Sequence, residues 1–294
     1  MPRMRGLGKN MLTDSLSISV VIPAYNRWNT LARALASVCG QTHPATEIIV
    51  VDDGSDTLVP NFIKEQFADV HFLRQENRGV ARARNTGIKQ CTGNWVALLD
   101  SDDEWEPSKL QKQVEHLGAH PGLFAVHTDE KWIRDGNEVT PPRYLDKSSN
   151  NLWERSLKRC LICPSSVILH QQVFDEVGGF DESLVVCEDY DFWLRLLLQM
   201  DIGLVDQRLV RKYGGHTDQL STTTWGMDRY RVQSLEKILT SASLPQDKEH
   251  ALISTLTEKL TILAHGAAKR GKAGEAKSYF ERLEKYQPAV LPSR

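Results

Sequence analysis

Acidic side chains directly follow two apolar runs of the sequence, and this placement could bind a cation. Asp52–Asp53 follow Glu47–Val51 (EIIVV), and Asp100–Asp103 (DSDD) follow Trp95–Leu99 (WVALL). If these runs are strands of an open α/β sheet, both acidic groups lie in the crevice at the carboxyl ends of the strands, where ligands bind. The three carboxylates within 100–103 repel one another, and Mg²⁺ or Mn²⁺ would neutralise them. A solvated acidic turn after each strand is the alternative.

A third acidic group and one histidine are the other candidates for chemistry. Glu188–Asp191 (EDYD) lies at the start of an apolar helix expected over 190–200. Carboxylates there complement the positive end of a helix, so capping explains them, whereas a general base would require Asp189 to face the crevice. His216 lies in a loop flanked by glycines, and both a surface position and a contact to metal or phosphate are open for it.

The elements that must position these groups alternate between strands and helices. Apolar, β-branched runs predict strands, and apolar residues at helical spacing predict the helices between them. Continuous apolar strands alternating with helices indicate an α/β fold with a mostly parallel sheet covered on both faces. The stretch 130–170 carries no clear pattern. The expected strands are 17–22, 47–51, 70–73, 95–99 and 124–127, and the expected helices are 29–39, 58–67, 80–90 and 107–120.

Beyond about residue 230 the pattern is helical only. Segments 250–267 and 272–287 predict a helical hairpin that turns at Arg270–Lys272 and is similar to one tetratricopeptide-like unit. Because a single such unit cannot form a solenoid, we expect the hairpin to pack on the main domain. Pairing of two copies as a homodimer through these helices, or docking of a partner, are the alternatives.

Composition and charge exclude several classes of protein. The 36 basic and 38 acidic residues leave a net charge of −2, so nucleic acid is not an expected partner. No apolar run approaches the roughly 18 residues of a membrane span, and the N-terminus lacks the apolar stretch of a secretory signal. The five scattered cysteines do not indicate a disulfide framework, and Cys160 and Cys163 are interpreted as packing residues rather than a zinc or redox site. A cytoplasmic location is expected, with contact to the inner face of the membrane left open.

Six short motifs identify a family. From about Ser17 to Ser221 the chain resembles the family 2 glycosyltransferases, whose nucleotide-sugar-binding fold is called GT-A. Each motif alone is weak, but six in the family's order are a strong signal, which favours Asp189 as a base over a capping role. The motifs are Val20–Arg27 (VVIPAYNR), Val50–Asp56 (VVDDGSD), Asn77–Gly87 (NRGVARARNTG), Leu98–Asp103 (LLDSDD), Gly178–Glu182 (GGFDE) and Glu188–Arg195 (EDYDFWLR).

The resemblance implies a role for each matching position. Tyr25 would lie against the base of the nucleotide, Asp53 would accept a hydrogen bond from it, and Arg84 would lie near the diphosphate. Asp189 would be the catalytic base, paired in its motif with Glu188, and Gly179 and Phe180 would shape the acceptor side. The implied nucleotide-sugar-binding residues are Pro23, Ala24, Tyr25, Asn26, Asp53, Arg84, Asn85, Asp100, Ser101 and Asp102, and the implied metal ligands are Asp102, Asp103 and, by a looser match, His216.

The activity that the resemblance implies is metal-dependent transfer of a sugar with inversion. The donor would be a nucleotide-diphosphate sugar, with a UDP-sugar expected first, and the acceptor a hydroxyl of a saccharide, a lipid-linked molecule or a protein in glycan or polysaccharide biosynthesis. A divalent Mg²⁺ or Mn²⁺ would offset charge on the leaving diphosphate. An inactive nucleotide-sugar-binding scaffold acting through the C-terminal helices is the alternative. A nucleotidyltransferase is disfavoured because 23–29 (PAYNRWN) contains no glycine for a triphosphate loop.

The resemblance also sets expected boundaries. A flexible tail would cover 1–15, the glycosyltransferase domain 16–225 and a C-terminal helical extension 226–294. Within the domain, a nucleotide-binding half would cover about 16–128 and an acceptor half about 129–225. The QxxRW motif and membrane helices of the family's processive members are missing from this sequence, so we expect a single addition of sugar.

Overall fold

A computed structural model describes residues 16–148, 150–215, 224–241 and 243–286 of the chain. His216 therefore lies outside the described residues. The helices and strands, in chain order, are β1 (Ile18–Ala24), α1 (Trp28–Cys39), β2 (Glu47–Asp52), α2 (Asn61–Gln66), β3 (His71–Arg74), α3 (Val80–Gln90), β4 (Trp95–Leu98), β5 (Glu104–Trp105), α4 (Lys109–Ala119), β6 (Ala125–Arg134), β7 (Asn137–Val139), α5 (Leu152–Lys158), β8 (Val167–His170), α6 (Gln171–Val177), α7 (Glu188–Gln199), β9 (Gly203–Gly214), α9 (Met227–Ser241), α10 (Gln246–Lys269) and α11 (Ala273–Glu284).

One sheet organises the chain, with its strands in the order β3-β2-β1-β4-β8-β6-β9-β5 and β7 paired to β6. The pairs β3–β2, β2–β1 and β1–β4 are parallel. β8 runs antiparallel to both β4 and β6, and β9 pairs parallel to β6 and antiparallel to β5. The expected α/β fold is thus present, with the parallel arrangement in the N-terminal half and mixed directions beyond β4.

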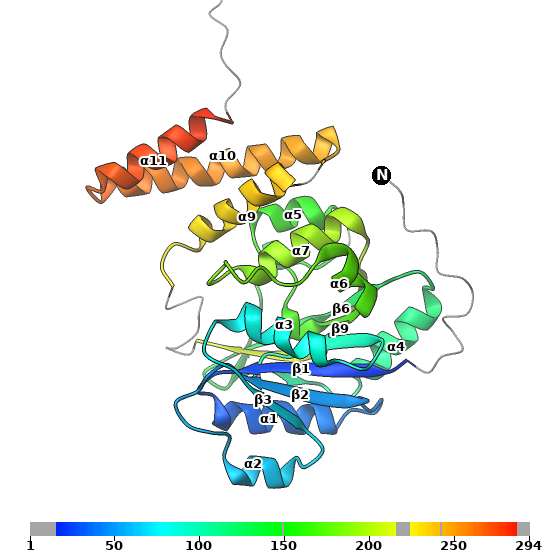
Figure 1. The fold of residues 1–294 in the computed structure, drawn as a ribbon. Helices are drawn as coiled ribbons and strands as arrows, with labels where there is room; N and C mark the ends of the chain where they lie inside the picture. The colour runs from blue at the N-terminus through cyan, green and yellow to red at the C-terminus, as the bar shows by residue number, and fades with distance from the viewer. Residues whose placement is uncertain (1–15, 149, 216–223, 242, 287–294) are drawn as a thin grey trace, which may run out of the picture.

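Helices cover both faces of the parallel strands because these strands are apolar on both sides. Every residue of β1 is buried. The apolar face of α1 packs on one side through Leu31 and Leu35, and α3 lies on the other side (Figure 1). Gly87 of α3 allows this close approach, because a Cβ there would lie 2.4 Å from Cγ1 of Val21. The carboxyl ends of these strands are therefore held at one edge of the sheet.

The segment that carried no sequence pattern contains well-defined elements. β6 continues to Arg134, far beyond the expected end at residue 127, and pairs along its length with β9. The polar half of β6 is stabilised by charges that are paired in the interior. Glu130, for example, is buried and accepts a hydrogen bond from the ammonium of Lys147. The pairing of polar strands depends on partners distant in sequence, which a local apolar pattern does not reveal.

His127 in β6 predicts a loss of stability in acid. Its ring is fully buried, both ring nitrogens lack a hydrogen-bond partner, and burial, followed by Lys147, lowers its pKa from 6.5 to about 3. As pH falls from 6.5 towards 3, His127 becomes protonated in the unfolded chain but stays neutral in the folded chain. The free energy of unfolding should therefore fall by at most about 1.4 kcal/mol per pH unit from this group. In urea titrations between pH 7 and 4, His127→Leu should flatten this slope, whereas His71→Leu at an exposed position should keep it. An unchanged slope in His127→Leu would contradict the prediction.

The C-terminal helices form a second packed layer on α5 and α7. Figure 1 shows α9 and α10 stacked on α5 and α7, on the side of these helices away from β1 and β2. The predicted hairpin is confirmed as α10 and α11, and the expected packing on the main body is confirmed by a continuous buried cluster. No helix among the described residues is long and apolar enough to cross a membrane. The cluster contains Trp153 and Leu157 of α5, Tyr190 and Leu194 of α7, Val232 and Leu235 of α9, and Leu252, Leu256 and Leu260 of α10.

Candidate active site

Asp53 is fixed at the carboxyl end of β2 by the loop that follows β3. It is buried, and its backbone N–H donates to the carbonyl of Ala24 at the end of β1 (2.8 Å). Its Oδ1 accepts hydrogen bonds from Nε2 of Gln75 (2.7 Å) and the N–H of Arg78 (3.0 Å), and its Oδ2 accepts one from the N–H of Gly79 (2.8 Å). The carboxylate is therefore held in one orientation at the edge where β1 and β2 end.

The loop after β1 is braced by an asparagine in the left-handed region. Asn26 has φ 53°, its N–H donates to Oγ of Ser55 (2.8 Å), and its side-chain amide exchanges hydrogen bonds with Asp56 (3.0 and 2.8 Å). The preceding Pro23 is part of β1, and the Tyr25 ring is 45% exposed. An exposed aromatic ring on a braced loop is available for stacking on a flat ligand.

The carboxylates of the acidic turn at 100–103 differ in burial, because one is buried and two are partly exposed. The N–H of Asp103 closes the turn on the carbonyl of Asp100 (3.0 Å). The Asp103 side chain is buried below, where it accepts hydrogen bonds from Oγ of Ser165 (2.7 Å) and the N–H of Tyr213 (3.0 Å). Burial, with the charges of Asp102 and Asp100, raises its pKa well above the usual range. Asp103 thus supports the turn, while Asp100 and Asp102 stay partly exposed, at 28% and 17% of their side chains.

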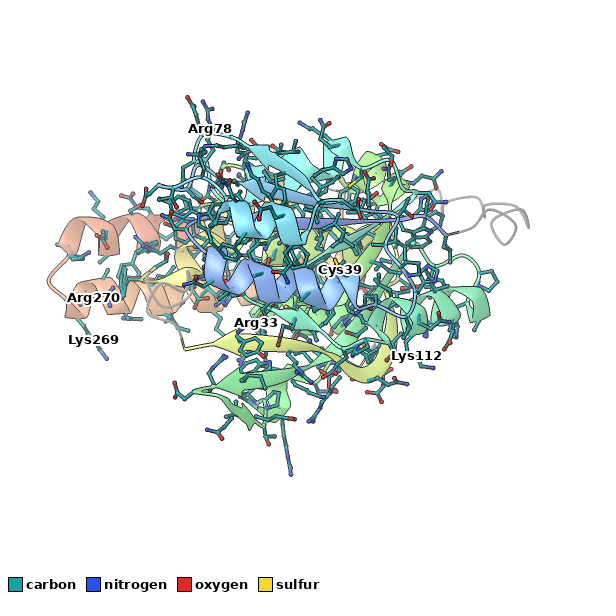
Figure 2. All side chains as sticks on the ribbon, turned by 90° about the horizontal axis from the view of Figure 1, so that it is seen from below. Arg33, Cys39, Arg78, Lys112, Lys269 and Arg270 are labelled. Carbon is teal, nitrogen blue, oxygen red and sulfur yellow. The ribbon has the colours of Figure 1, made fainter. Side chains whose placement is uncertain are left out.

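Two arginines that the sequence did not single out hold Asp102. Arg27, the residue before α1, forms an ion pair with its carboxylate, and Nη2 of Arg33 donates to its backbone carbonyl (2.7 Å). Figure 2 shows Arg33 between α1 and β9, where its guanidinium lies 3.8 Å from the centre of the Tyr213 ring. Burial and the Asp100 charge raise the pKa of Asp102, and Arg27 opposes this shift. Arg27 ends the motif Val20–Arg27, but its pairing with Asp102 is seen only in the folded chain.

Arg84 joins the start of α7 to the end of β4. Its guanidinium is buried and donates through Nη1 to Oε1 of Glu188 (2.6 Å) and through Nη2 to Oδ1 of Asp100 (2.7 Å). The two carboxylates keep the pKa of Arg84 raised, so it remains charged. Burial, and then the neighbouring Asp189, raise the pKa of Glu188 to about 7 against the opposing effect of Arg84. The acidic turn and the Glu188–Asp189 pair are therefore parts of one site, and the diphosphate contact of Arg84 stays a prediction.

Asp189 is half-buried at the first turn of α7, beside the thiol of Cys160. Its Oδ1 accepts the N–H of Tyr190 (2.7 Å), and its Oδ2 lies 3.4 Å from Sγ of Cys160. Burial and the Asp189 charge raise the pKa of Cys160 well above its usual value, so the thiol donates a weak hydrogen bond. Cys163 is buried with its Sγ 3.9 Å from Oδ2 of Asp103. Both cysteines pack against the acidic groups of the site, a placement that the sequence did not indicate.

Asn85 connects α3 to the glycine turn before α7. Its Oδ1 accepts the N–H of Phe180 (2.9 Å), and its Nδ2 donates to the Phe180 carbonyl (2.9 Å) and to Glu182 (2.9 Å). Gly179 leaves room for this amide, because a Cβ there would lie 2.7 Å from Oδ1 of Asn85. The Phe180 ring is buried and stacks on Phe192 with centroids 4.5 Å apart. Gly179 and Phe180 therefore hold the turn in place, and the nucleotide contact of Asn85 stays a prediction.

The donor set at the turn fits a divalent cation that shares its ligands with a substrate. No three His, Cys, Asp or Glu side chains converge as a metal site within the described residues. Asp100 and Asp102 nevertheless lie in one turn, and both are partly exposed. Burial, and then the charge of Asp100, raise the pKa of Asp102, and a cation would offset this repulsion. Mg²⁺ typically takes one or two carboxylates and completes its shell with water and substrate phosphates. Ser101 is buried beside them, and both oxygens of Asp103 already accept hydrogen bonds from the protein.

The chain is similar to sugar-transferring proteins in sequence. The sequence profile of glycosyl transferase family 2 matches residues 19–178. An uncharacterized glycosyltransferase of Rickettsia bellii is 30% identical over 78% of the chain, and the chain spans 33% of its length, as it spans 34% and 35% of two further Rickettsia relatives. A putative teichuronic acid biosynthesis glycosyltransferase of Bacillus subtilis, TuaG, is 27% identical over 71% of the chain and 82% of its own length.

Solved structures share the fold. S. aureus TarS 1–349 in complex with UDP-GlcNAc has a TM-score of 0.74 at 18% identity, over 92% of this chain and 82% of the TarS chain. The mannosyltransferase PcManGT from Pyrobaculum calidifontis, in complex with GDP-Man and Mn²⁺, has a TM-score of 0.58 at 18% identity, over 92% of this chain and 83% of its own. The expected GT-A fold, an α/β sheet flanked by helices with C-terminal helices added, is confirmed. The sheet is mixed and not mostly parallel, because the strands beyond β4 pair in both directions.

Proposed function

The chain belongs to glycosyl transferase family 2, and from this premise we propose that it transfers a sugar from a nucleotide-diphosphate sugar to a hydroxyl acceptor, with inversion. The observation that carries the proposal is the bridge made by Arg84. One buried guanidinium contacts Asp100 of the acidic turn and Glu188 beside Asp189. A donor held at the turn and a base at α7 would therefore meet in one crevice.

The nucleotide would lie across the ends of β1 and β2. The exposed Tyr25 ring would stack on the base, and Asp53 would accept a hydrogen bond from it at the remaining lone pair of Oδ2. The diphosphate would then extend towards Asp100 and Asp102, which with the diphosphate would hold the divalent cation. When bound, this cation supplies positive charge that offsets the negative charge developing on the leaving diphosphate. His216, which lies outside the described residues, stays a predicted ligand.

Asp189 is the group proposed to take the proton from the acceptor hydroxyl. Its neighbour Glu188 is a poor candidate because Oε1 of Glu188 is bound to Arg84 in the interior. The acceptor oxygen would form a bond to the anomeric carbon while the bond from that carbon to the diphosphate oxygen breaks, and the hydroxyl proton would pass to the Asp189 carboxylate. A single displacement of this kind inverts the anomeric centre. Glu188, Arg84 and Asp100 would orient the base and the donor.

The donor and the pathway are proposed from the likenesses together with the site. A UDP-sugar is the first candidate, supported by the UDP-GlcNAc complex of a structure with the same fold, and a divalent metal is supported by the Mn²⁺ complex of another. A role in polysaccharide biosynthesis is supported by TuaG. A homodimer through the C-terminal helices and contact with a membrane surface stay predictions.

A thermal-shift panel with and without Mn²⁺ tests the donor and the metal. A ligand at 100 times its dissociation constant stabilises the folded state by about 2.7 kcal/mol, which should raise the melting temperature by several degrees. We expect a shift from UDP-GlcNAc with Mn²⁺, little shift in EDTA, and a smaller shift from GDP-mannose. In the variant Asp102→Asn, the melting-temperature shift caused by UDP-GlcNAc should no longer depend on Mn²⁺.

Transfer itself would be measured by mass spectrometry with saccharide acceptors. New glycosylated product supports the enzyme. A donor that binds without any transfer or hydrolysis across the acceptor panel would instead support a nucleotide-sugar-binding scaffold. A melting-temperature shift by UDP-GlcNAc that is equal with Mn²⁺ and in excess EDTA would contradict the proposed metal dependence of donor binding.

A further inference from the structure

An exposed tryptophan two residues before α9 is surrounded by cations. Trp225 is 50% exposed. The guanidinium of Arg229 lies 4.8 Å from the centre of its ring, that of Arg270 4.5 Å and the ammonium of Lys272 5.4 Å. Arg229 belongs to α9, whereas Arg270 and Lys272 belong to the turn between α10 and α11, so the fold gathers these charges from distant parts of the chain.

The two arginines of this group carry charge that no described carboxylate neutralises. Arg229 donates to the backbone carbonyls of Trp225 (2.6 Å) and Gly226 (3.4 Å), and Lys272 pairs with Glu275 (2.9 Å). No carboxylate of the described residues lies within ion-pair distance of Arg229 or Arg270. Figure 2 shows Arg270 at the outer end of its helix. Like charges brought together around one ring repel one another, and a bound anion would offset the repulsion.

A cavity of about 300 Å³ opens beside this ring. Trp225, Met227 and Ile262 supply apolar surface, and Arg231 and Arg270 supply positive charge. Asp228 also lines the cavity, but its carboxylate is already paired with Arg231 and Lys259. Nε of Arg231 is buried without a hydrogen-bond partner, although its Nη1 pairs with Asp228 (2.8 Å). An apolar wall with guanidinium groups around it matches a sugar ring that carries an acid group, because arginine binds carboxylate and phosphate in a planar, two-point geometry. We call this cavity, with the cations around its tryptophan, the Trp225 pocket.

The Trp225 pocket lies next to the residues that present the proposed base. The carbonyl of Met227 accepts a hydrogen bond from Sγ of Cys187 (3.7 Å), and the guanidinium of Arg231 lies 5.9 Å from the Tyr190 ring. Cys187 and Tyr190 flank the Glu188–Asp189 pair in the sequence. One wall of the pocket is thus built on the first turn of α7, where the acceptor hydroxyl must arrive.

We infer that the Trp225 pocket binds an acidic unit of the acceptor, a saccharide residue carrying a carboxylate or a phosphate, and so selects an anionic glycan over a neutral one. That the ligand is an acceptor rests on the proposed function, and that it is acidic rests on the charge and shape of the pocket. Binding there would hold the acceptor glycan at one point while its terminal hydroxyl reaches Asp189. The hydroxyl would then be oriented for attack before the reaction begins.

The test measures binding of defined oligosaccharides to the whole chain by calorimetry. The probes are tetragalacturonate, which carries carboxylates, a glycerol phosphate oligomer, which carries phosphates, and neutral maltotetraose. The double variant Arg229→Gln/Arg270→Gln removes both guanidinium charges from the ring, and Lys269→Gln, which removes an exposed charge next to Arg270 in the sequence but not one of the three around Trp225, is the matched control. The melting temperature of each variant checks that it is folded.

At least one acidic probe should bind to the unmodified chain and to Lys269→Gln with equal affinity, and should bind more weakly as salt is added. In the double variant its affinity should fall by about tenfold or more for each guanidinium removed. Whichever acidic probe binds identifies the acid group. Equal binding by the double variant, equal binding of maltotetraose, or no binding of either acidic probe would each overturn the inference.

The thermal shift with UDP-GlcNAc, measured on the same variants, separates this inference from the proposed function. The shift should be equal in all of them, because none of the substituted residues lies in the donor crevice. A missing donor shift with retained binding of the acidic probe would count against the transferase and leave the pocket intact, whereas the reverse pattern would count against the pocket alone.

Discussion

The substitution Asp189→Asn should lower sugar transfer by about 10²–10⁴-fold, the range typical of a lost general base. Asparagine has nearly the same shape, and its Oδ1 can still accept the N–H of Tyr190 (2.7 Å), so the first turn of α7 should be preserved. The amide cannot accept the proton of the acceptor hydroxyl at neutral pH. Initial rates of product formation at saturating donor measure the effect, together with the melting-temperature shift caused by UDP-GlcNAc.

The melting-temperature shift caused by UDP-GlcNAc, called the donor shift, is the internal control of this experiment. It should remain, because Asp189 touches the acceptor and not the nucleotide in the proposed site. Asp201→Asn, at an exposed position just after α7, should change neither quantity. Transfer at the normal rate in Asp189→Asn would show that the base is another group, whereas loss of both transfer and the donor shift would show that the substitution disturbed the crevice as a whole.

The substitution Arg84→Met should reduce both stability and activity. Methionine keeps much of the volume but leaves Glu188 and Asp100 without the guanidinium that they share in the interior. Removing one partner of a buried ion pair typically costs about 3–5 kcal/mol. Without the bridge, Glu188 should take up a proton and the start of α7 should lose its link to β4, so transfer should fall as well. Urea titration gives the free energy of unfolding, and initial rates give the activity.

The matched control lies two residues away on the same helix. Arg82 is partly exposed and pairs with Glu182 at 3.0 Å, and such surface pairs contribute about 0–1 kcal/mol. Arg82→Met should therefore be almost as stable as the unmodified chain. Combining Arg84→Met with Glu188→Gln should cost less than the sum of the single changes, because the double variant has no carboxyl group at position 188 that must take up a proton when the guanidinium is lost. Strict additivity, or an Arg84→Met variant as stable as Arg82→Met, would disprove the structural role.

Much of the fold follows from local patterns of the sequence. β1, β2 and β4 are continuous apolar runs, and the helices between them have one apolar face, so their type and order could be predicted. The acidic groups at the ends of β2 and β4 could be predicted for the same reason, because parallel strands end at one edge of a sheet. β9 could not be predicted, because its apolar and charged residues follow no regular alternation and the strand is defined by its pairing with β6.

The partners within the site are the part that the sequence could not reveal. Arg84 and Glu188 are 104 positions apart, and nothing local indicates that one binds the other. The acidic turn shows the same limit, because Asp102 and Asp103 are adjacent and identical in type. Only the fold shows that Asp103 is buried under Ser165 while Asp102 stays partly open. Residue types therefore indicated which segments form the site. Only the contacts in the folded chain showed which of these residues are buried supports and which are open to a ligand.

The shared core of α5, α7, α9 and α10 has a consequence for how this chain can change over time. Tyr190 lies beside the proposed base, and it is buried together with Leu235 of α9 and Leu256 of α10. Recombination at the border before α9 would bring foreign helices against this surface and shift the helix that carries Asp189. New acceptor preferences are therefore expected to arise by point substitutions around Trp225 rather than by exchange of the whole C-terminal segment, which must be inherited together with the helices beneath it.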